Sequence, residues 1–415
     1  MNTINELTID GERLWSTLER SGEIGPGRAG GLCRLPLTDA DREMRDQFID
    51  WCEAAGCTIT IDRLGNIFAR REGSEPELPP VLVGSHLDSQ VAGGKYDGIL
   101  GVLSGLEVIR SLNDAGLTTR RAIEVVCWTN EEGARFQPPM QCSGAFAGVH
   151  DVEWVLESQD DDGAVFGDEL ARIGYAGEAP VGGRDLDSYF ELHIEQGPAL
   201  EAANVPLGIV VGGYFSRGMV LEIRGENAHA GPTPMDKRRN ALVGASHLVV
   251  AANDIGWAHH ETEGKSTATR LLLWPNKPGI LPDWAQLTVD FRHPDKAVTL
   301  EMEAKMREAI KHAEARAQVE VEVTSTWEFG DEAFDADCMQ LLRETANDLG
   351  VEFQEMLSQA GHDAYHMTRV TPTALIFSPC KEGITHNENE HIERGYTEPS
   401  VNVLLHAILR RANRV

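Results

Sequence analysis

The chain has 415 residues, of which 66 are acidic and 37 basic, and its net charge is −29. Hydrophobic residues make up 41% of the sequence, so the chain is globular and long enough for two domains. A surface this acidic repels phosphate backbones and anionic membranes, which argues against nucleic acid and membrane as partners.

The seven cysteines are scattered and form no C-x-x-C pair, which favours a reducing compartment over a disulfide framework. The first residues, MNTINELTIDGERLW, lack the basic and apolar regions of a signal peptide. No run approaches the ~20 apolar residues that a membrane span needs. We therefore expect a cytoplasmic protein.

In chain order, the first half alternates between helical and strand patterns. Residues 1–60 are predicted to be helical, with one helix opened by Asp39-Ala40-Asp41 and continuing through Trp51. Another helix is predicted over 99–112, where apolar residues recur at helical spacing. Buried strands are predicted at 81–84, 123–129 and 189–194. Residues 158–180, with the run Asp160-Asp161-Asp162, are expected to form a solvated loop. This alternation predicts an α/β domain with a largely parallel sheet.

A different order of elements runs from 213 to 330. Strands are predicted at 219–224, 270–274, 285–292 and 319–327, and helices at 238–253 and 300–317. The order βαββαβ is that of a ferredoxin-like sandwich, which would form its own core. The α/β pattern then resumes with a helix at 338–349, a strand at 374–378 and a terminal helix at 401–412. We therefore predict an α/β catalytic domain, residues 1–212 and 331–415, interrupted by an inserted domain, residues 213–330.

Five short segments concentrate residue types that bind metal ions. They are GSHLDS at 84–89, GGKYDG at 93–98, TNEEG at 129–133, ELHIEQG at 191–197 and GITHN at 383–387. Four of them lie at or after the ends of predicted strands, and the second opens the next helix. Because ligands bind beyond the carboxyl ends of parallel strands, we expect the five segments to converge on one site.

The chemistry of such a site favours a two-metal hydrolase. Neutral imidazoles and carboxylates bind Zn²⁺, Mn²⁺, Ni²⁺ or Co²⁺, and two ions need a bridging carboxylate and an activated bridging water. A further glutamate beside a ligand can take the proton from the water. Taken singly, each segment is a weak signal, because a lone histidine beside a strand is more often structural and a Glu-Glu pair is usually solvated. Their joint occurrence at strand ends carries the prediction.

The segments also resemble a known family. SHLDS, GGKYDGILGVLSGLE, WTNEEGARF, ELHIEQGP, NAHAGPTPM, AGHDA and GITHN are similar, over nearly the whole chain, to the amidase branch of the M20 metallopeptidase superfamily. That branch contains N-carbamoyl-L-amino-acid hydrolases, β-ureidopropionases and allantoate amidohydrolases. The resemblance implies a metal-binding α/β domain interrupted by a dimerisation or lid domain, in a homodimer.

The resemblance also implies residue roles. The ligands implied for two divalent ions per subunit (Zn, Mn, Co or Ni) are His86 and His193 for one, Glu132 and His386 for the other, and Asp97 as the bridge. Glu131 would be the general base towards a metal-bridging water, and Asp88 would orient His86.

Substrate contacts follow from the same resemblance. They are Gln196, His229, Asn276, Arg292 and Gly361. His229 would reach the neighbouring subunit's site and stabilise an oxyanion, and Arg292 would grip a substrate carboxylate with its fork of donors. Without the resemblance, His229 would be a turn histidine and Arg292 as readily an ordinary ion-pair residue.

Two departures from the family pattern affect the substrate rather than the metals. Where the family has a stretch like PNAVNVIPGE, this chain has PNKPGILPD at 275–283, so Gly279 stands at the second Asn and only Asn276 is kept. The family's SGAGHDA reads SQAGHDA at 358–364. A glycine donates no side-chain hydrogen bond and leaves space.

The leading hypothesis is therefore a metal-dependent amidohydrolase acting on an N-carbamoyl-L-amino acid or a similar small carboxylate. Alternatives within the same mechanism are an N-acyl amino-acid amidase and an allantoate or β-ureidopropionate amidohydrolase. An alternative of another class is a metal-dependent ligand-binding protein without catalysis, which Glu131 argues against. A dinucleotide site is disfavoured because Gly93-Gly94 lacks the G-x-G-x-x-G spacing.

Overall fold

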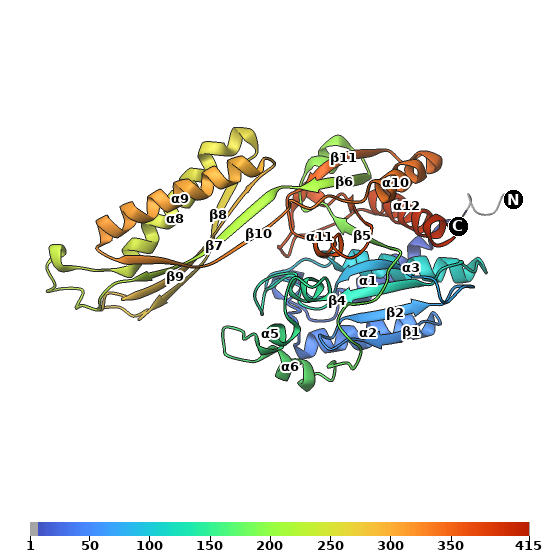
Figure 1. Cartoon of the computed structure of the whole chain (residues 1–415), viewed down its shortest axis with the longest axis horizontal. Coiled ribbons are helices and arrows are strands. Elements are labelled where there is room, and N and C mark those ends of the chain that lie inside the picture. The colour runs from blue at the N-terminus through green and yellow to red at the C-terminus, as the bar shows by residue number, and fades with distance from the viewer. Residues whose placement is uncertain (1–6, 415) are drawn as a thin grey trace. The chain divides into compact units, whose positions relative to one another are not determined.

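The computed structural model describes residues 7–414, and the chain divides into two compact units, Met1–Val211 with Ala333–Val415, and Gly212–Glu332. Each unit has its own sheet and its own hydrophobic core (Figure 1). Residues 1–6 of the predicted helical stretch lie outside the described residues. Within residues 7–414, no helix is long and apolar enough to cross a membrane.

The first unit contains a mixed sheet of eight strands in the order β1-β2-β4-β3-β5-β12-β6-β11. Its strands are β1 Thr58–Ile61, β2 Ile67–Arg71, β3 Val81–His86, β4 Ile123–Trp128, β5 Ser188–Ile194, β6 Leu207–Gly213, β11 Phe353–Ser358 and β12 Thr373–Ser378. The central strands β4, β3, β5 and β12 run parallel, whereas β1 pairs antiparallel with β2, β2 with β4, and β6 with β12. The predicted α/β fold is confirmed, and the parallel part is its centre.

The helices of this unit cover the sheet. They are α1 Gly11–Ser21, α2 Asp39–Ala54, α3 Ile99–Asp114, α4 Gln141–Phe146, α5 Val152–Glu157, α6 Phe166–Arg172, α7 Ala199–Ala203, α10 Ala336–Leu349, α11 Asp363–Met367 and α12 Arg394–Ala412, with short 3-10 turns at Arg28–Gly30 and Lys381–Gly383. Helix α3 packs on β3, β4 and β5, and α12 packs on β12, β5 and β3. Every residue of β3, β4, β5 and β12 is buried, which explains their continuous apolar runs.

Two sequence expectations for this unit need correction. The stretch 1–60 is not continuously helical, because α1 and α2 are separated by a loop and the edge strand β1 begins at Thr58. The predicted solvated loop at 158–180 contains α6, whose Phe166 and Leu170 are buried. Asp160 is not a solvated acid: it pairs with Arg135 at 2.9 Å and accepts the N–H groups of residues 162 and 164.

The second unit has the order βαββαβ that the sequence predicted. Its elements are β7 Phe215–Arg224, α8 Ala241–His259, β8 Lys265–Trp274, β9 Trp284–His293, α9 Lys296–Ala317 and β10 Glu320–Phe329, with 3-10 turns at Met235–Lys237 and His260–Thr262. The antiparallel sheet has the order β10-β7-β9-β8, and both helices lie on one of its faces (Figure 1). Alternate residues of β9, such as Leu287 and Val289, enter the core beneath α8 and α9. This is the ferredoxin-like arrangement, with β8 as an edge strand.

Candidate active site

The polar segments predicted to converge lie at one edge of the large sheet. His86 is the last residue of β3 and pairs in register with Trp128, the last residue of β4. His193 lies near the end of β5 and pairs with Phe377 of β12. Because these four strands are parallel, their carboxyl ends meet at the same edge. The loops that follow them carry Glu131, Glu132 and His386.

One group of side chains surrounds a single oxygen of Asp97. Asp97 Oδ1 lies 3.1 Å from His193 Nε2 and 3.7 Å from His86 Nε2. Both histidines are oriented through their other nitrogen: His86 Nδ1 lies 3.0 Å from the Asp88 carbonyl oxygen, and His193 Nδ1 lies 2.8 Å from that of Ile194. Nδ1–H donation to a carbonyl leaves the Nε2 lone pair of a neutral imidazole facing the Asp97 side.

A second group surrounds the other oxygen of the same carboxylate. His386 Nε2 lies 3.3 Å from Asp97 Oδ2 and 3.2 Å from Glu132 Oε2. Gln90 Nε2 donates to Glu132 Oε2 at 2.9 Å and holds that carboxylate in place. The pKa of His386 is raised to about 11, and the largest cause is the negative charge of Glu132. The Asp97 carboxylate is therefore shared between two ligand-like groups.

Glu131 lies beside the first group, with Oε2 3.4 Å from His86 Nε2 and its side chain almost fully buried. Burial, reinforced by Asp363 and Glu132, raises the pKa of Glu131 well above its usual value. Asp88 does not bond His86 through its carboxylate, which is 3.8 Å away. That carboxylate instead lies 3.3 Å from the Glu131 N–H and 3.2 Å from the Glu132 N–H. Asp88 thus fixes the loop that carries both glutamates, while its own backbone carbonyl orients His86.

The charge balance of this edge fits divalent cations. Among residues 7–414, the ion-pair partners of Asp97, Glu131 and Glu132 are histidines, and no lysine or arginine pairs with them. Buried carboxylates without a cation are costly. The ligand atoms of His86, Asp97 and His193 lie within 4.8 Å of one another, as do those of Asp97, Glu132 and His386. This donor set of imidazoles and carboxylates suits Zn²⁺, Mn²⁺, Co²⁺ or Ni²⁺.

A third acid–histidine group is less suited to an ion. Glu191, His193 and His362 also come within 4.8 Å. However, Ser85, Tyr189 and the Ala364 N–H already donate to the Glu191 carboxylate. Its oxygens are engaged by protein donors, so we do not assign a metal to this group.

Gly98 makes the packing at this edge possible. Its φ is +69°, and a Cβ at this position would lie 2.2 Å from His86 Nε2. Its N–H approaches His193 Nε2 at 3.1 Å. Any side chain at 98 would therefore displace the His86 ring.

The predicted substrate residues of the first unit lie next to this edge. Gln196 Nε2 donates to Asp97 Oδ2 at 2.8 Å, and its Oε1 is buried without a hydrogen-bond partner. Gly361 is half-buried and precedes His362, whose ring lies 4.5 Å from that of His193. Gln196 thus contacts a residue of both ligand-like groups, and Gly361 lies next to a histidine that packs against His193.

The remaining predicted substrate residues belong to the second unit and lie at two ends of its sheet. His229 is exposed and forms a bridge with Ile280, and the Ala230 N–H donates to the Gly279 carbonyl at 2.9 Å. Gly279 has φ +88°, and a Cβ added to it would meet no atom within 4 Å, so the space around it is open. Asn276 is exposed in the same loop. The residue expected to grip a carboxylate, Arg292, lies at the far end of β9.

Arg292 has a defined setting within the second unit. Its Nε donates to both oxygens of Asp290, at 3.0 and 3.2 Å, and its guanidinium carbon lies 5.6 Å from the centre of the Phe329 ring. It pairs across strands with Lys265 of β8 and Ser216 of β7. The ion pair with Asp290 keeps open the interpretation of Arg292 as an ordinary ion-pair residue.

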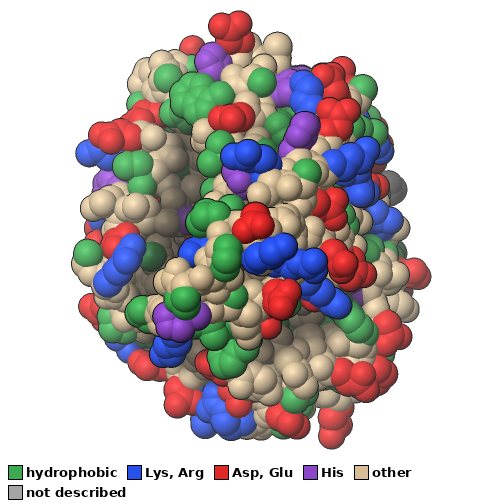
Figure 2. All heavy atoms as spheres, turned by 90° about the vertical axis from the view of Figure 1, so that its left-hand side faces the viewer, with side chains coloured by type: hydrophobic (Ala, Val, Ile, Leu, Met, Phe, Trp, Pro, Cys, Tyr) green, Lys and Arg blue, Asp and Glu red, His purple; other side chains and the backbone are tan. Residues whose placement is uncertain are grey.

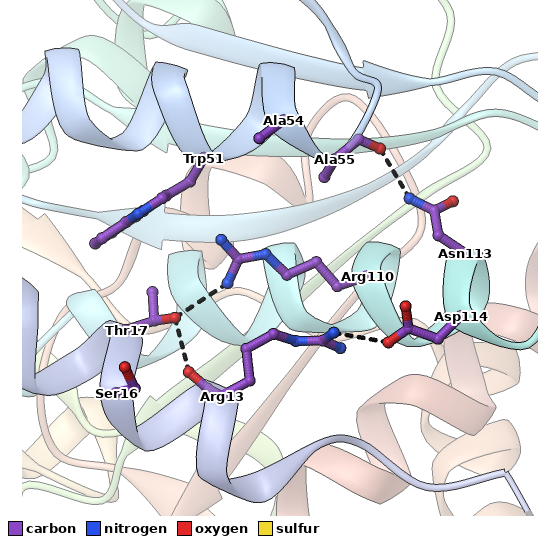
Figure 3. Close-up of a pocket in the computed structure, with 9 residues that line it drawn as sticks. All are labelled: Arg13, Ser16, Thr17, Trp51, Ala54, Ala55, Arg110, Asn113 and Asp114. Atoms are coloured by element: carbon purple, nitrogen blue, oxygen red, sulfur yellow. Dashed lines mark hydrogen bonds and ion pairs between the residues drawn. The ribbon is translucent and has the colours of Figure 1, made fainter.

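A cavity of about 360 Å³ lies elsewhere in the first unit, between α1, α2 and α3 (Figure 3). Arg13 there is bound by Glu107 and Asp114, while Arg110 donates to the Thr17 hydroxyl and faces the Trp51 ring. Its lining contains no histidine. The cavity therefore lacks the ligand set found at the sheet edge.

Sequence reasoning missed three polar residues that support the ligand-like groups. Gln90 contacts Glu132, and Thr385 and Glu390 contact the segment that carries Asp97. Gln90 and Thr385 lie within or one residue beyond the recognised segments, but Glu390 has no motif of its own. Its partners are 293 and 294 residues away in the chain, so only the fold brings them together.

Comparison with known proteins agrees with this geometry. Residues 82–410 match the model of peptidase family M20/M25/M40. An N-carbamoyl-L-amino-acid amidohydrolase of Rhizobium meliloti is 42% identical over 408 residues, which is 98% of each chain. A ureidoglycolate hydrolase of Arabidopsis thaliana is 30% identical over 94% of this chain and 84% of its own.

A solved structure supports the same assignment. The crystal structure of an amidase of the hydantoinase/carbamoylase family from Burkholderia vietnamiensis is 46% identical and superposes with a TM-score of 0.95 over 100% of this chain and 99% of its own. The resemblance found in the sequence is therefore confirmed: the chain belongs to peptidase family M20/M25/M40, and within it to the branch of metal-dependent amidohydrolases that contains the N-carbamoyl-L-amino-acid amidohydrolases.

Proposed function

We propose that this protein hydrolyses the ureido C–N bond of an N-carbamoyl-L-amino acid, releasing the amino acid, CO₂ and ammonia. The observation that carries the proposal is the Asp97 carboxylate, shared between a His86–His193 group and a Glu132–His386 group. The R. meliloti relative, named for this activity, supports the choice of substrate.

Two divalent ions per subunit would be held by the five residues of these groups, and Asp97 belongs to both groups. When bound, the ions would acidify water and polarise the scissile carbonyl. Glu131 is then the general base: its carboxylate is buried, lies beside His86 and pairs with no lysine or arginine among the described residues. A carboxylate with a raised pKa accepts a proton and can pass it to the leaving nitrogen. Gln196 holds Asp97 Oδ2, and its unpartnered Oε1 is available to a substrate N–H.

Arg292 is proposed to bind the substrate carboxylate. Its Nε is engaged with Asp290, which orients the guanidinium plane. A guanidinium fork matches a carboxylate, and one cation at the binding point offsets the overall charge of −29. Asn276 and Gly361 are the proposed further contacts to the substrate.

A homodimer is proposed because His229 and Arg292 lie too far apart in one chain to touch the same small substrate. Arg292 is eight residues along β9 from Trp284, a span of about 26 Å in an extended strand. His229 pairs with Ile280, beyond the Trp284 end. If both residues contact substrate, as the resemblance implies, one of them must come from a second chain.

The surface of the second unit supports this assembly. On α8, Val243, Val250 and Trp257 are exposed at intervals of seven residues, which places them on one side of the helix. Leu272 and Trp274 are exposed on the edge strand β8. Hydrophobic side chains reach the surface between charged ones on the face in Figure 2. Such exposed apolar positions beside an unpaired strand edge are typical of an interface.

Gly279 supports a second candidate within the same mechanism. The open space around it could admit a larger group than a carbamoyl, as in an N-acyl amino-acid amidase. Cleavage of allantoate or a related ureido acid is supported by the Arabidopsis ureidoglycolate hydrolase and by a probable allantoate deiminase of rice, 30% identical over 90% of this chain. A cytoplasmic location is also proposed, and the seven free cysteines support it.

The test is ammonia release from a panel of N-carbamoyl-L-amino acids, allantoate and β-ureidopropionate, with N-acyl amino acids followed by release of the amino acid. The enzyme is supplied in turn with Mn²⁺, Co²⁺, Ni²⁺ or Zn²⁺, and metal-loaded Glu131→Gln is the control. Turnover of an N-carbamoyl-L-amino acid that chelation abolishes is the expected result. If fully metal-loaded protein turns over no member of the panel, the enzymatic proposal fails in favour of a ligand-binding role.

A further inference from the structure

Glu390 is a buried carboxylate that the proposed reaction does not use. Its Oε1 accepts the Tyr96 N–H at 2.8 Å and the Asp97 N–H at 3.1 Å. It is 6% exposed, and within residues 7–414 it forms no ion pair with a lysine, arginine or histidine. A carboxyl group buried in this way requires hydrogen-bond partners, and the backbone N–H groups of Tyr96 and Asp97 provide two.

The other oxygen of Glu390 reaches Asp97 by a second route. Thr385 Oγ1 lies 3.1 Å from Glu390 Oε2 and 2.8 Å from Asp97 Oδ2. The Thr385 hydroxyl is thus held between the two carboxylates. Glu390 therefore fixes Asp97 from its backbone and, through Thr385, at the oxygen that faces His386.

Gly94 shows that the loop is shaped around Glu390. A Cβ at position 94 would lie 2.0 Å from Glu390 Cδ and 2.1 Å from Oε1. The glycine is required here by the close approach of the carboxylate rather than by its backbone angles. This accounts for the second glycine of the GGKYDG segment.

Glu390 is not placed to be a ligand itself. Both of its oxygens face protein donors, and it belongs to none of the acid–histidine groups that could hold an ion among the described residues. Its contacts join the loop that carries Asp97 to the loop that carries His386. A small displacement of the Asp97 carboxylate changes the ligand geometry of the His86–His193 group and of the Glu132–His386 group at the same time.

We propose that Glu390 is a positioning residue for Asp97, which sets the affinity of the site for divalent ions by fixing the Tyr96–Asp97 backbone and the Thr385 hydroxyl. The inference rests on the proposed two-metal function. Residues that support metal ligands typically change metal affinity by about 10–100-fold when they are removed. We therefore expect the dissociation constant for Mn²⁺ to rise by about that factor in Glu390→Ala. Glu390→Gln, which keeps the shape and one acceptor, should lie between that variant and the wild type.

The experiment measures Mn²⁺ binding to the full chain by competition with a chelating indicator, and unfolding of the metal-free protein in parallel. Glu393→Gln is the matched control, because it removes a carboxylate from an exposed position in the same segment. Gly94→Ala is a second route to the same perturbation, because its Cβ would push the Glu390 carboxylate away. Glu390→Ala and Gly94→Ala should both weaken Mn²⁺ binding if Glu390 acts as proposed, whereas the control should not.

The outcomes separate this inference from the proposed function. Wild type that binds none of Mn²⁺, Co²⁺, Ni²⁺ and Zn²⁺ overturns the two-metal function, and this inference with it; if another of these ions binds in place of Mn²⁺, the variants are compared with that ion. Wild type that binds two ions while Glu390→Ala and Glu390→Gln bind them equally tightly overturns the positioning role alone. A lower unfolding temperature of the metal-free variants with unchanged Mn²⁺ affinity also overturns it, because that result describes a structural residue. Should Glu390→Ala fail to fold, Glu390→Gln and Gly94→Ala decide the question by the same measurement.

Discussion

Gly98 immediately precedes helix α3, and Gly116 lies just after its C-terminal end. Alanine substitution at each of the two positions distinguishes an effect on backbone strain from a displacement of the site residues. Both have positive φ, +69° and +62°, so alanine at either position is strained, and the strain at Gly98 is the larger because its ψ of −42° lies outside the left-handed helical region. At Gly116 nothing lies within 4 Å of the added Cβ. At Gly98 the Cβ would lie 2.2 Å from His86 Nε2, and ordinary contact begins at 3.4 Å, so the ring must move by about 1.2 Å. We therefore expect Gly98→Ala to lose activity and metal affinity as well as stability.

The loss can be estimated from that displacement. A misplacement of about 1 Å in a catalytic arrangement can reduce turnover on the order of 10²-fold. Gly98→Ala should therefore lower kcat/KM by roughly that factor and weaken metal binding, while Gly116→Ala lowers only the free energy of unfolding. The assays are ammonia release at saturating metal, metal competition with a chelator and urea unfolding. Equal kcat/KM and equal metal affinity in the two variants would refute the reasoning that His86 is held against Gly98.

Four further predictions use other parts of the chain. Glu131→Gln should keep its metals and lose about 10²–10⁴-fold in kcat, and a near-normal kcat would exclude it as the base. Arg292→Ala should lower kcat/KM at least roughly tenfold and lose the preference for an acid over its carboxamide analogue, with Arg292→Lys rescuing only in part; equal discrimination by both enzymes would contradict this. Mixing His229→Ala with Glu131→Gln subunits should restore up to roughly a quarter of wild-type activity, since half of the dimers are mixed and each has one intact site; no recovery despite subunit exchange would place His229 outside the partner's site. Burial first, then His150 and Arg369, lower the pKa of His366 to about 3. Because the unfolded imidazole titrates near 6.5, the folded state loses stability as pH falls through that range, by up to about 2 kcal/mol between pH 7 and 5. His366→Gln should lose less on acidification, as urea unfolding at the two pH values will measure; an equal loss would contradict the buried neutral state.

The central architecture could be predicted from sequence because its strands are mostly apolar. Strands β3, β4, β5 and β12 are fully buried, and their sequences are more hydrophobic than the segments on either side of them. Strand β1, by contrast, alternates between exposed and half-buried residues over only four positions, which is too short for a periodic signal. Strand β1 was therefore not predicted.

The site shows the same division. Histidines and carboxylates at strand ends could be identified because parallel strands bring their carboxyl ends together. What could not be predicted is which atom of a residue makes the contact: Asp88 orients His86 with its backbone oxygen and uses its carboxylate for the Glu131–Glu132 loop. Glu390 could not be found at all, because its donors are backbone N–H groups nearly three hundred residues earlier.

The position of β12 in the sheet has a consequence for the order in which the protein can fold during synthesis. This strand lies between β5 and β6, yet it is made after the whole of the inserted unit has left the ribosome. Residues 212–332 are contiguous, so their sheet can form early. The larger sheet cannot be completed until β12 has emerged, at residue 378, because this strand pairs with both β5 and β6. Until then β5 and β6 expose unpaired edges, so we expect the nascent chain to be most prone to aggregation in this interval.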